Sequence, residues 1–146
     1  MKTPSHTLSE KEKEIITKEI KKVVDVIIEG SEKTDFDMAI APYLNSPDFI
    51  YILQGNILSY EDSVNFLKPV FEQLSNQVLA TKSEKISFID ESTVLYTANL
   101  TCQMNFKNGS SVLLDPLAMF LLFRKIDNVW KVAYAVESYV EKAVEE

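Results

Sequence analysis

Cysteine, histidine and long apolar runs are scarce in this sequence of 146 residues, and each scarcity removes a class of protein. The single cysteine, Cys102, has no partner for an internal disulfide. This favours a cytoplasmic protein, although an exported chain supplied without its leader would look the same. The single histidine, His6, lies near the N-terminus, and no clustered ligands accompany it, so we expect no metal. No apolar run approaches the roughly 20 residues of a membrane span.

Positive charge is scarce as well, because 15 Lys and Arg residues stand against 22 Asp and Glu residues, for a net charge of −7. An acidic surface repels phosphate backbones and anionic lipid surfaces. We therefore expect neither nucleic acid nor a membrane as a partner. Phosphate-loop, dinucleotide and nucleophile-elbow motifs are absent, so we expect no cofactor.

Glycine and proline are few, which leaves no low-complexity segment or long linker. Apolar residues make up 46% of the chain, enough for a core of ordinary size. The sequence predicts a single domain over residues 1–146, with residues 1–9 as a flexible tail.

Helix signals occupy the first half of the chain. Ser9 and Glu12 have the spacing of a capping box, and Gly30 is a plausible helix end. Between them an apolar stripe recurs at steps of three and four residues. Its members are Ile16, Ile20, Val23, Val24, Ile27 and Ile28. The pattern predicts an amphipathic helix that covers a sheet.

Shorter elements follow this helix. The segment Asp35–Leu44 indicates a short second helix, and Phe49–Leu53 is rich in strand-forming residues. Ile57 and Leu58 are expected to return as a short strand. A third helix should begin after Ser59 and kink or restart at Pro69, which lacks a backbone donor.

From about Val78 the apolar period changes to two, which indicates strands. The expected strands are Gln77–Ser83, Glu84–Asp90, Thr93–Lys107, Ser110–Lys125 and Val129–Val140. Helices followed by a run of antiparallel strands indicate an α+β fold, with the helices packed on one face of the sheet.

Two turns predict how the last strands pair. Asn108-Gly109 favours a tight type I′ hairpin, which sets Cys102 opposite Asp115. If Asp127-Asn128 is equally tight, Ala118 faces Glu137. Opposed residues share a face, so the more apolar face is assigned to the core and the mixed face to a homodimer interface. A bulge in either hairpin would swap these assignments for one strand.

Asp115 is the only carboxylate on this predicted inner face, and it is the candidate catalytic acid or base. The alternative is a solvated aspartate at a strand end. A further set of residues is expected to line a small apolar cavity and to bind the ligand. They are Tyr51, Tyr96, Met119, Trp130, Tyr134 and Ser138. Glu137 is expected on the outer face and would serve a cavity only if the register slips.

Two segments carry a family resemblance: "EGSEKTDFDMAIAPYLNSPDFIYI" and the ending "FRKIDNVWKVAYAVESY". Both are similar to the nuclear-transport-factor-2-like superfamily, which includes ketosteroid isomerases, scytalone dehydratases and SnoaL-like cyclases. The resemblance covers about Glu10 to Tyr139. It implies a cone or half-barrel of three helices over a strongly curved antiparallel sheet, a pocket inside, and dimers through the outer sheet face.

The departures from the family concern catalysis. Tyr51 or Ile52 stands where ketosteroid isomerases place an aspartate base, and the first helix holds no tyrosine for an oxyanion hole. Val136 stands where a histidine is frequent, so neither a ketosteroid isomerase nor a histidine-based dehydratase is supported.

Three functions remain open from the sequence. The favoured one is a noncatalytic domain that binds a small apolar molecule and forms a homodimer. The second is an acid/base isomerase, cyclase or dehydratase without metal, in which Asp115 carries the proton and Tyr134 or Tyr51 polarises an oxygen. The third is a protein–protein interaction module whose cavity is filled by side chains.

Overall fold

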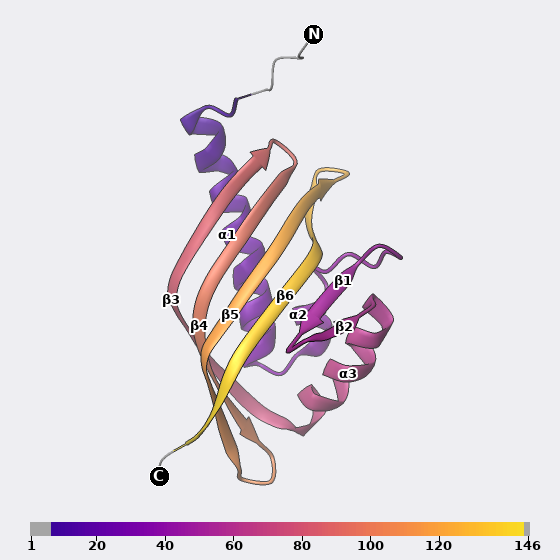
Figure 1. Cartoon of the computed structure of the whole chain (residues 1–146), viewed down its shortest axis with the longest axis vertical. Coiled ribbons are helices and arrows are strands. Elements are labelled where there is room, and N and C mark those ends of the chain that lie inside the picture. The colour runs from indigo at the N-terminus through magenta and orange to yellow at the C-terminus, as the bar shows by residue number, and fades with distance from the viewer. Residues whose placement is uncertain (1–6, 145–146) are drawn as a thin grey trace.

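Helices lie on one side of a long sheet in the computed structural model, which describes residues 7–144 (Figure 1). The helices are α1 (Glu10–Glu32), α2 (Phe36–Ile40) and α3 (Tyr60–Gln73). Helix α1 crosses one face of the long strands, while α2 and α3 lie beside the short strands (Figure 1). The predicted α+β class with N-terminal helices is confirmed.

Six strands form one mixed sheet in the order β2-β1-β6-β5-β4-β3. They are β1 (Ile50–Leu53), β2 (Asn56–Leu58), β3 (Leu74–Asp90), β4 (Thr93–Phe106), β5 (Ser111–Ile126) and β6 (Val129–Ala143). The expectation of a purely antiparallel sheet is wrong, because β1 pairs with β6 in parallel. The two strands expected at 77–83 and 84–90 are one strand that continues past a register shift between Thr81 and Ser83.

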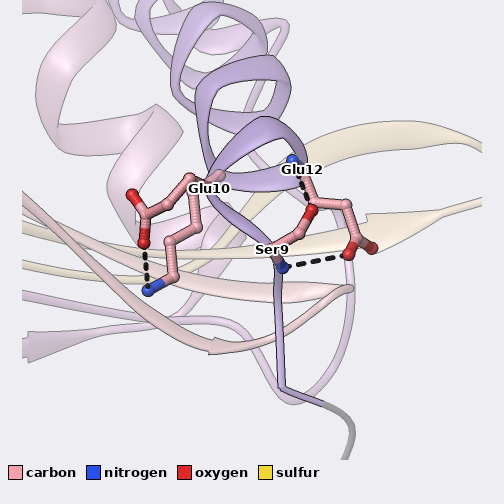
Figure 2. A network of polar contacts seen from close by, with 4 residues as sticks. Ser9, Glu10 and Glu12 are labelled. Carbon is pink, nitrogen blue, oxygen red and sulfur yellow. Dashed lines mark hydrogen bonds and ion pairs between the residues drawn. The ribbon is translucent and has the colours of Figure 1, made fainter.

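Helix α1 begins at the predicted capping box. Ser9 accepts a hydrogen bond from the Glu12 amide, and Glu12 accepts one from the Ser9 amide (Figure 2). Residues 1–6 of the expected tail lie outside the described residues, while Leu8 is buried in the core.

The end of α1 differs from the prediction, because the helix passes Gly30 and ends at Glu32. The Asp35 amide donates to the Gly30 carbonyl at 2.8 Å and the Thr34 amide to the Ser31 carbonyl at 3.2 Å. This is a Schellman closure, with Thr34 at φ 55° in the place that glycine usually takes. Gly30 instead allows close helix packing, since a Cβ there would lie 2.6 Å from the Ala39 nitrogen.

Helix α3 carries the second capping box, formed by Ser59 and Asp62. Pro69 lies inside this helix, which continues as one element to Gln73, so the expected restart does not occur. Asp35 caps the short α2 through the Met38 amide.

The β4–β5 hairpin is one residue out of the predicted register near its turn. A type I′ turn needs positive φ at both central residues, but only Gly109, with φ 92°, has it, so the turn is of another type. As a result, Cys102 pairs with Leu114 rather than with Asp115. A bulge at Asp115-Pro116 then restores the predicted pairing, in which Leu100 faces Leu117.

The β5–β6 hairpin starts in the predicted register and then departs from it. Asp127 and Asn128 both have positive φ, which makes this the tight turn. A bulge after Val132 shifts the pairing, so Met119 faces Glu137. From there to the strand end, the inner and outer faces of β6 are swapped relative to the prediction.

The core lies between α1 and the inner face of β3 to β6. Ile20, Val94, Leu121, Phe123 and Val132 are fully buried there. No helix within residues 7–144 combines the length and apolar character that crossing a membrane requires.

Candidate functional site

A cavity of about 340 Å³ lies between the helices and the inner face of the sheet. Helix α1 contributes Ile27, Ile28 and Ser31, while α2, α3 and the long strands supply most of the remaining wall. The wall is largely apolar and holds seven aromatic rings. They belong to Phe36, Tyr43, Tyr51, Phe66, Phe71, Phe106 and Tyr139. Such a lining suits an apolar occupant of small size.

The main polar group in the cavity is a tyrosine–glutamate pair. The Tyr51 hydroxyl donates a hydrogen bond to Oε2 of Glu137. Tyr51 comes from β1 and Glu137 from β6, and the parallel pairing of these strands sets Tyr51 beside Ala135 and Leu53 beside Glu137. Tyr43 lies against Tyr51 with its ring nearly parallel, and the centroids are 6.4 Å apart.

The Glu137 side chain is half-buried and lines the cavity. Burial raises the pKa of Glu137, while the hydrogen bond from Tyr51 opposes that rise. Burial, followed by the charge of Glu137, also raises the pKa of Tyr51 and of Tyr43 far above the usual value for tyrosine. Both tyrosines therefore keep their protons at neutral pH.

Glu137 has no cationic partner among residues 7–144. The ion pairs in that range join other residues, and the cavity wall contains Glu137 and Glu141 but no Lys, Arg or His. A buried carboxylate without a cation is unfavourable, and neutralisation or a ligand relieves it. Glu137 is thus the chemically distinctive group of the cavity.

A second polar group lies on the β3–β4 side of the cavity. The Cys102 thiol lies 3.3 Å from Oε1 of Gln77, and the Gln77 amide donates to the Ser31 carbonyl at 2.9 Å. Burial raises the pKa of Cys102 to about 12, so the thiol is not a nucleophile at neutral pH. These hydrogen bonds pair the polar groups of Cys102 and Gln77 and hold this part of the cavity wall in place.

Two of the six predicted ligand-binding residues, Tyr51 and Met119, lie in the cavity wall. Tyr96 and Trp130 are buried outside it. The Tyr96 hydroxyl donates to Glu84 at 2.6 Å, and the Trp130 indole donates to Glu19 at 3.4 Å. Tyr96 thus joins β4 to β3, and Trp130 joins β6 to α1.

Tyr134 and Ser138 were expected on the inner face, and this placement is wrong. The bulge after Val132 turns both side chains outward, where Tyr134 pairs with Leu122 and Ser138 with Ala118. The same bulge brings Glu137 inward.

The placement of Asp115 on the inner face is also wrong, because the altered hairpin register puts it in the β5 bulge. Its carboxylate lies 3.3 Å from Nζ of Lys82 and 3.6 Å from Nζ of Lys142. The hydrogen bond from Lys82 lowers the pKa of Asp115. Asp115 is not part of the cavity wall.

Sequence reasoning missed Tyr43 and placed Glu137 on the wrong face. The only sequence signal for Glu137 was that a one-residue slip in β6 would bring it into the cavity. Tyr43 enters through its bridge to Val132, a contact that no local pattern reveals. Within residues 7–144, no three His, Cys, Asp or Glu side chains gather as a metal site.

No protein-family model and no curated protein matches this sequence. Solved structures do match. A scytalone dehydratase-like protein from Novosphingobium aromaticivorans DSM 12444 has a TM-score of 0.83 at 10% identity, covering 94% of this chain and 93% of that one. A type 3 hexachlorocyclohexane dehydrochlorinase from Novosphingobium barchaimii LL02 has a TM-score of 0.76 at 13% identity, covering 93% and 94%.

A third similar structure is a nuclear transport factor 2-like superfamily protein from Salmonella enterica serovar Typhimurium LT2. Its TM-score is 0.77 at 14% identity, with coverage of 89% of this chain and 94% of that one. These structures agree with one another in fold while two of them are described by different reactions. At such identities the likeness concerns the arrangement of the backbone, and function has to be argued from the cavity.

Proposed function

We propose that this chain, which has the nuclear-transport-factor-2-like fold, binds a small apolar molecule in its internal cavity. The observation that carries the proposal is an apolar cavity of about 340 Å³ with one polar anchor, the Tyr51–Glu137 pair. This volume is at the low end of the range for small-molecule sites, roughly 300 to 1,000 Å³. The sheet then acts as a curved half-barrel that holds the ligand against the helices.

The polar anchor orients the ligand. Apolar walls supply affinity without direction, whereas a hydroxyl and a carboxyl at one place select the end of the ligand that carries a polar group. We therefore expect a ligand with an apolar body and one polar end that points at Tyr51 and Glu137.

The proposal is tested by measuring melting temperature with 2-phenylethanol, a neutral probe with this outline. Binding to the folded state raises the melting temperature by linkage. Leu79→Trp places a large ring in the cavity wall and should weaken binding by about tenfold or more.

Val78→Trp is the matched control, because Val78 adjoins Leu79 on β3 but is 52% exposed and outside the cavity wall. This variant should bind as the unaltered protein does. Binding that survives Leu79→Trp unchanged, or no binding by the unaltered protein, would contradict the proposal.

A second candidate function is acid/base catalysis, and the unpaired Glu137 favours it. A carboxyl whose pKa is raised by burial holds a proton more readily than an exposed one, and the Tyr51 hydroxyl can polarise a substrate oxygen. Glu137 replaces Asp115 as the candidate proton carrier, because Asp115 lies outside the cavity and pairs with two lysines. Such an enzyme would be an isomerase or lyase.

We also propose that the chain forms a homodimer through the sheet face opposite α1. Apolar side chains on three adjacent strands are partly exposed there, and the strand register makes them contiguous. They are Leu95, Phe120, Leu122, Tyr134 and Val136. Covering such a patch with its own copy removes apolar surface from water.

A further inference from the structure

The charges that line the cavity are all of one sign. Glu137 and Glu141 are its only charged side chains among residues 7–144, and the other groups that face Glu137 are the neutral Tyr43, Tyr51 and Tyr139. Cys102, on β4, is also neutral. The protein thus surrounds a carboxyl group with apolar walls and hydroxyl groups and supplies no cation.

We propose that the cavity selects a lipophilic amine, whose ammonium group pairs with the Glu137 carboxylate while its apolar body fills the remaining space. This inference rests on the proposed function and names the ligand class of the same site.

The carboxyl group has room for such a partner. Oε2 of Glu137 accepts the Tyr51 hydroxyl, while Oε1 accepts no hydrogen bond from the described residues, and the Glu137 side chain lines the cavity. An ammonium group donates up to three hydrogen bonds, so it can occupy Oε1 without displacing Tyr51. Hydrogen bonds between opposite charges are shorter and stronger than those between neutral groups.

The free-energy balance favours an amine over a neutral ligand of equal size. Folding has already removed most of the Glu137 side chain from water, so the main desolvation cost of binding falls on the ammonium group. The aromatic rings of the wall offset part of that penalty, because their faces attract cations. An anionic ligand would instead meet two like charges.

Three probes of equal length separate these cases: 2-phenylethylamine, 2-phenylethanol and phenylacetate. By titration calorimetry at a pH where the amine is charged, the amine should bind at least about tenfold more tightly than the alcohol. The carboxylate should bind more weakly than the alcohol.

Variants test whether the Glu137 carboxylate causes the preference for the amine over the alcohol. Glu137→Gln keeps the shape and the acceptor for Tyr51 but removes the charge, so the amine and the alcohol should then bind within about threefold of each other. Glu14→Gln, an equal change of charge on the exposed face of α1, should keep the full preference.

The outcomes are distinguishable. Equal binding of amine and alcohol by the unaltered protein, or a preference that survives Glu137→Gln, overturns the amine inference and leaves the cavity proposal intact. Failure of all three probes to bind overturns both. If Glu137→Gln does not fold, Glu137→Met takes its place: an amine preference that persists in Glu137→Met overturns the inference, and its loss supports it.

Discussion

Glu137 is the residue on which the chemistry of this molecule depends. It is a cavity carboxyl whose pKa burial raises, and Tyr51 is its hydrogen-bond donor. Its placement could not be read from the sequence, because a single extra residue in β6 decides which of two neighbours, Glu137 or Ser138, faces inward. A register change in the β4–β5 hairpin likewise removes Asp115 from the inner face, where the sequence had placed it.

The raised pKa of Glu137 predicts how the stability of the protein varies with pH. Below the ordinary carboxyl pKa of 4.5, Glu137 is protonated in both the folded and the unfolded chain. Its burial then costs little stability, because the neutral form carries no charge. Between 4.5 and the higher folded-state pKa, the unfolded chain releases the proton while the folded chain still holds it, so stability falls as pH rises through this range. The free energy of unfolding of Glu137→Gln relative to the unaltered protein should therefore increase as pH rises above 4.5 and level off above the folded-state pKa of Glu137.

This difference is measured by urea unfolding at several pH values, since comparison with the variant cancels the groups that both proteins share. Glu84, Asp90 and Asp115 have lowered pKa values and oppose the trend, so the curve of one protein alone is not decisive. Glu14→Gln should show no pH-dependent gain. A relative stability of Glu137→Gln that stays flat or falls with rising pH would argue against a buried, unpaired carboxyl.

At the scale of single elements, the helices were easier to predict than the sheet. The capping boxes at Ser9 and Ser59 mark the starts of α1 and α3 because a cap needs only residues that are close in sequence. The parallel pairing of β1 with β6 joins residues more than 80 positions apart, and no local pattern carries it. Bulges likewise depend on tertiary packing.

The end of α1 yields a prediction of its own. Thr34 holds φ 55° in the Schellman closure, a conformation that is unfavourable for a β-branched residue and free for glycine. Thr34→Gly should therefore raise the free energy of unfolding by about 1 kcal/mol. Thr34→Ala keeps a Cβ in the same conformation and should gain much less. Urea unfolding checks both variants, and equal effects of the two would contradict the conformational explanation.

At the scale of the whole molecule, the sequence predicted the α+β layers and the family fold but not the composition of the site. The inner placement of Leu117, Met119 and Cys102 follows from strand alternation and is confirmed. The wall of the cavity combines these strands with α2, α3 and β1, so it exists only after packing brings segments from the whole chain together.

The proposed homodimer is a prediction at this same scale. Phe120→Glu and Val136→Glu place charges on adjacent strands of the outer face, where the two positions pair. Sedimentation analysis should find a dimer for the unaltered protein and a monomer for the double variant, because a buried charge without a partner opposes association. Glu14→Gln serves as the control. A monomeric unaltered protein at high concentration would contradict the proposal.

The occupancy of the cavity is the central claim, and a crystal structure with 2-phenylethylamine tests it most directly. The account predicts the phenyl ring among the apolar side chains of the cavity and the amine nitrogen within hydrogen-bond distance of Oε1 of Glu137, roughly 2.7 to 3.2 Å. A ligand bound elsewhere, or a cavity closed by its own side chains, would contradict it.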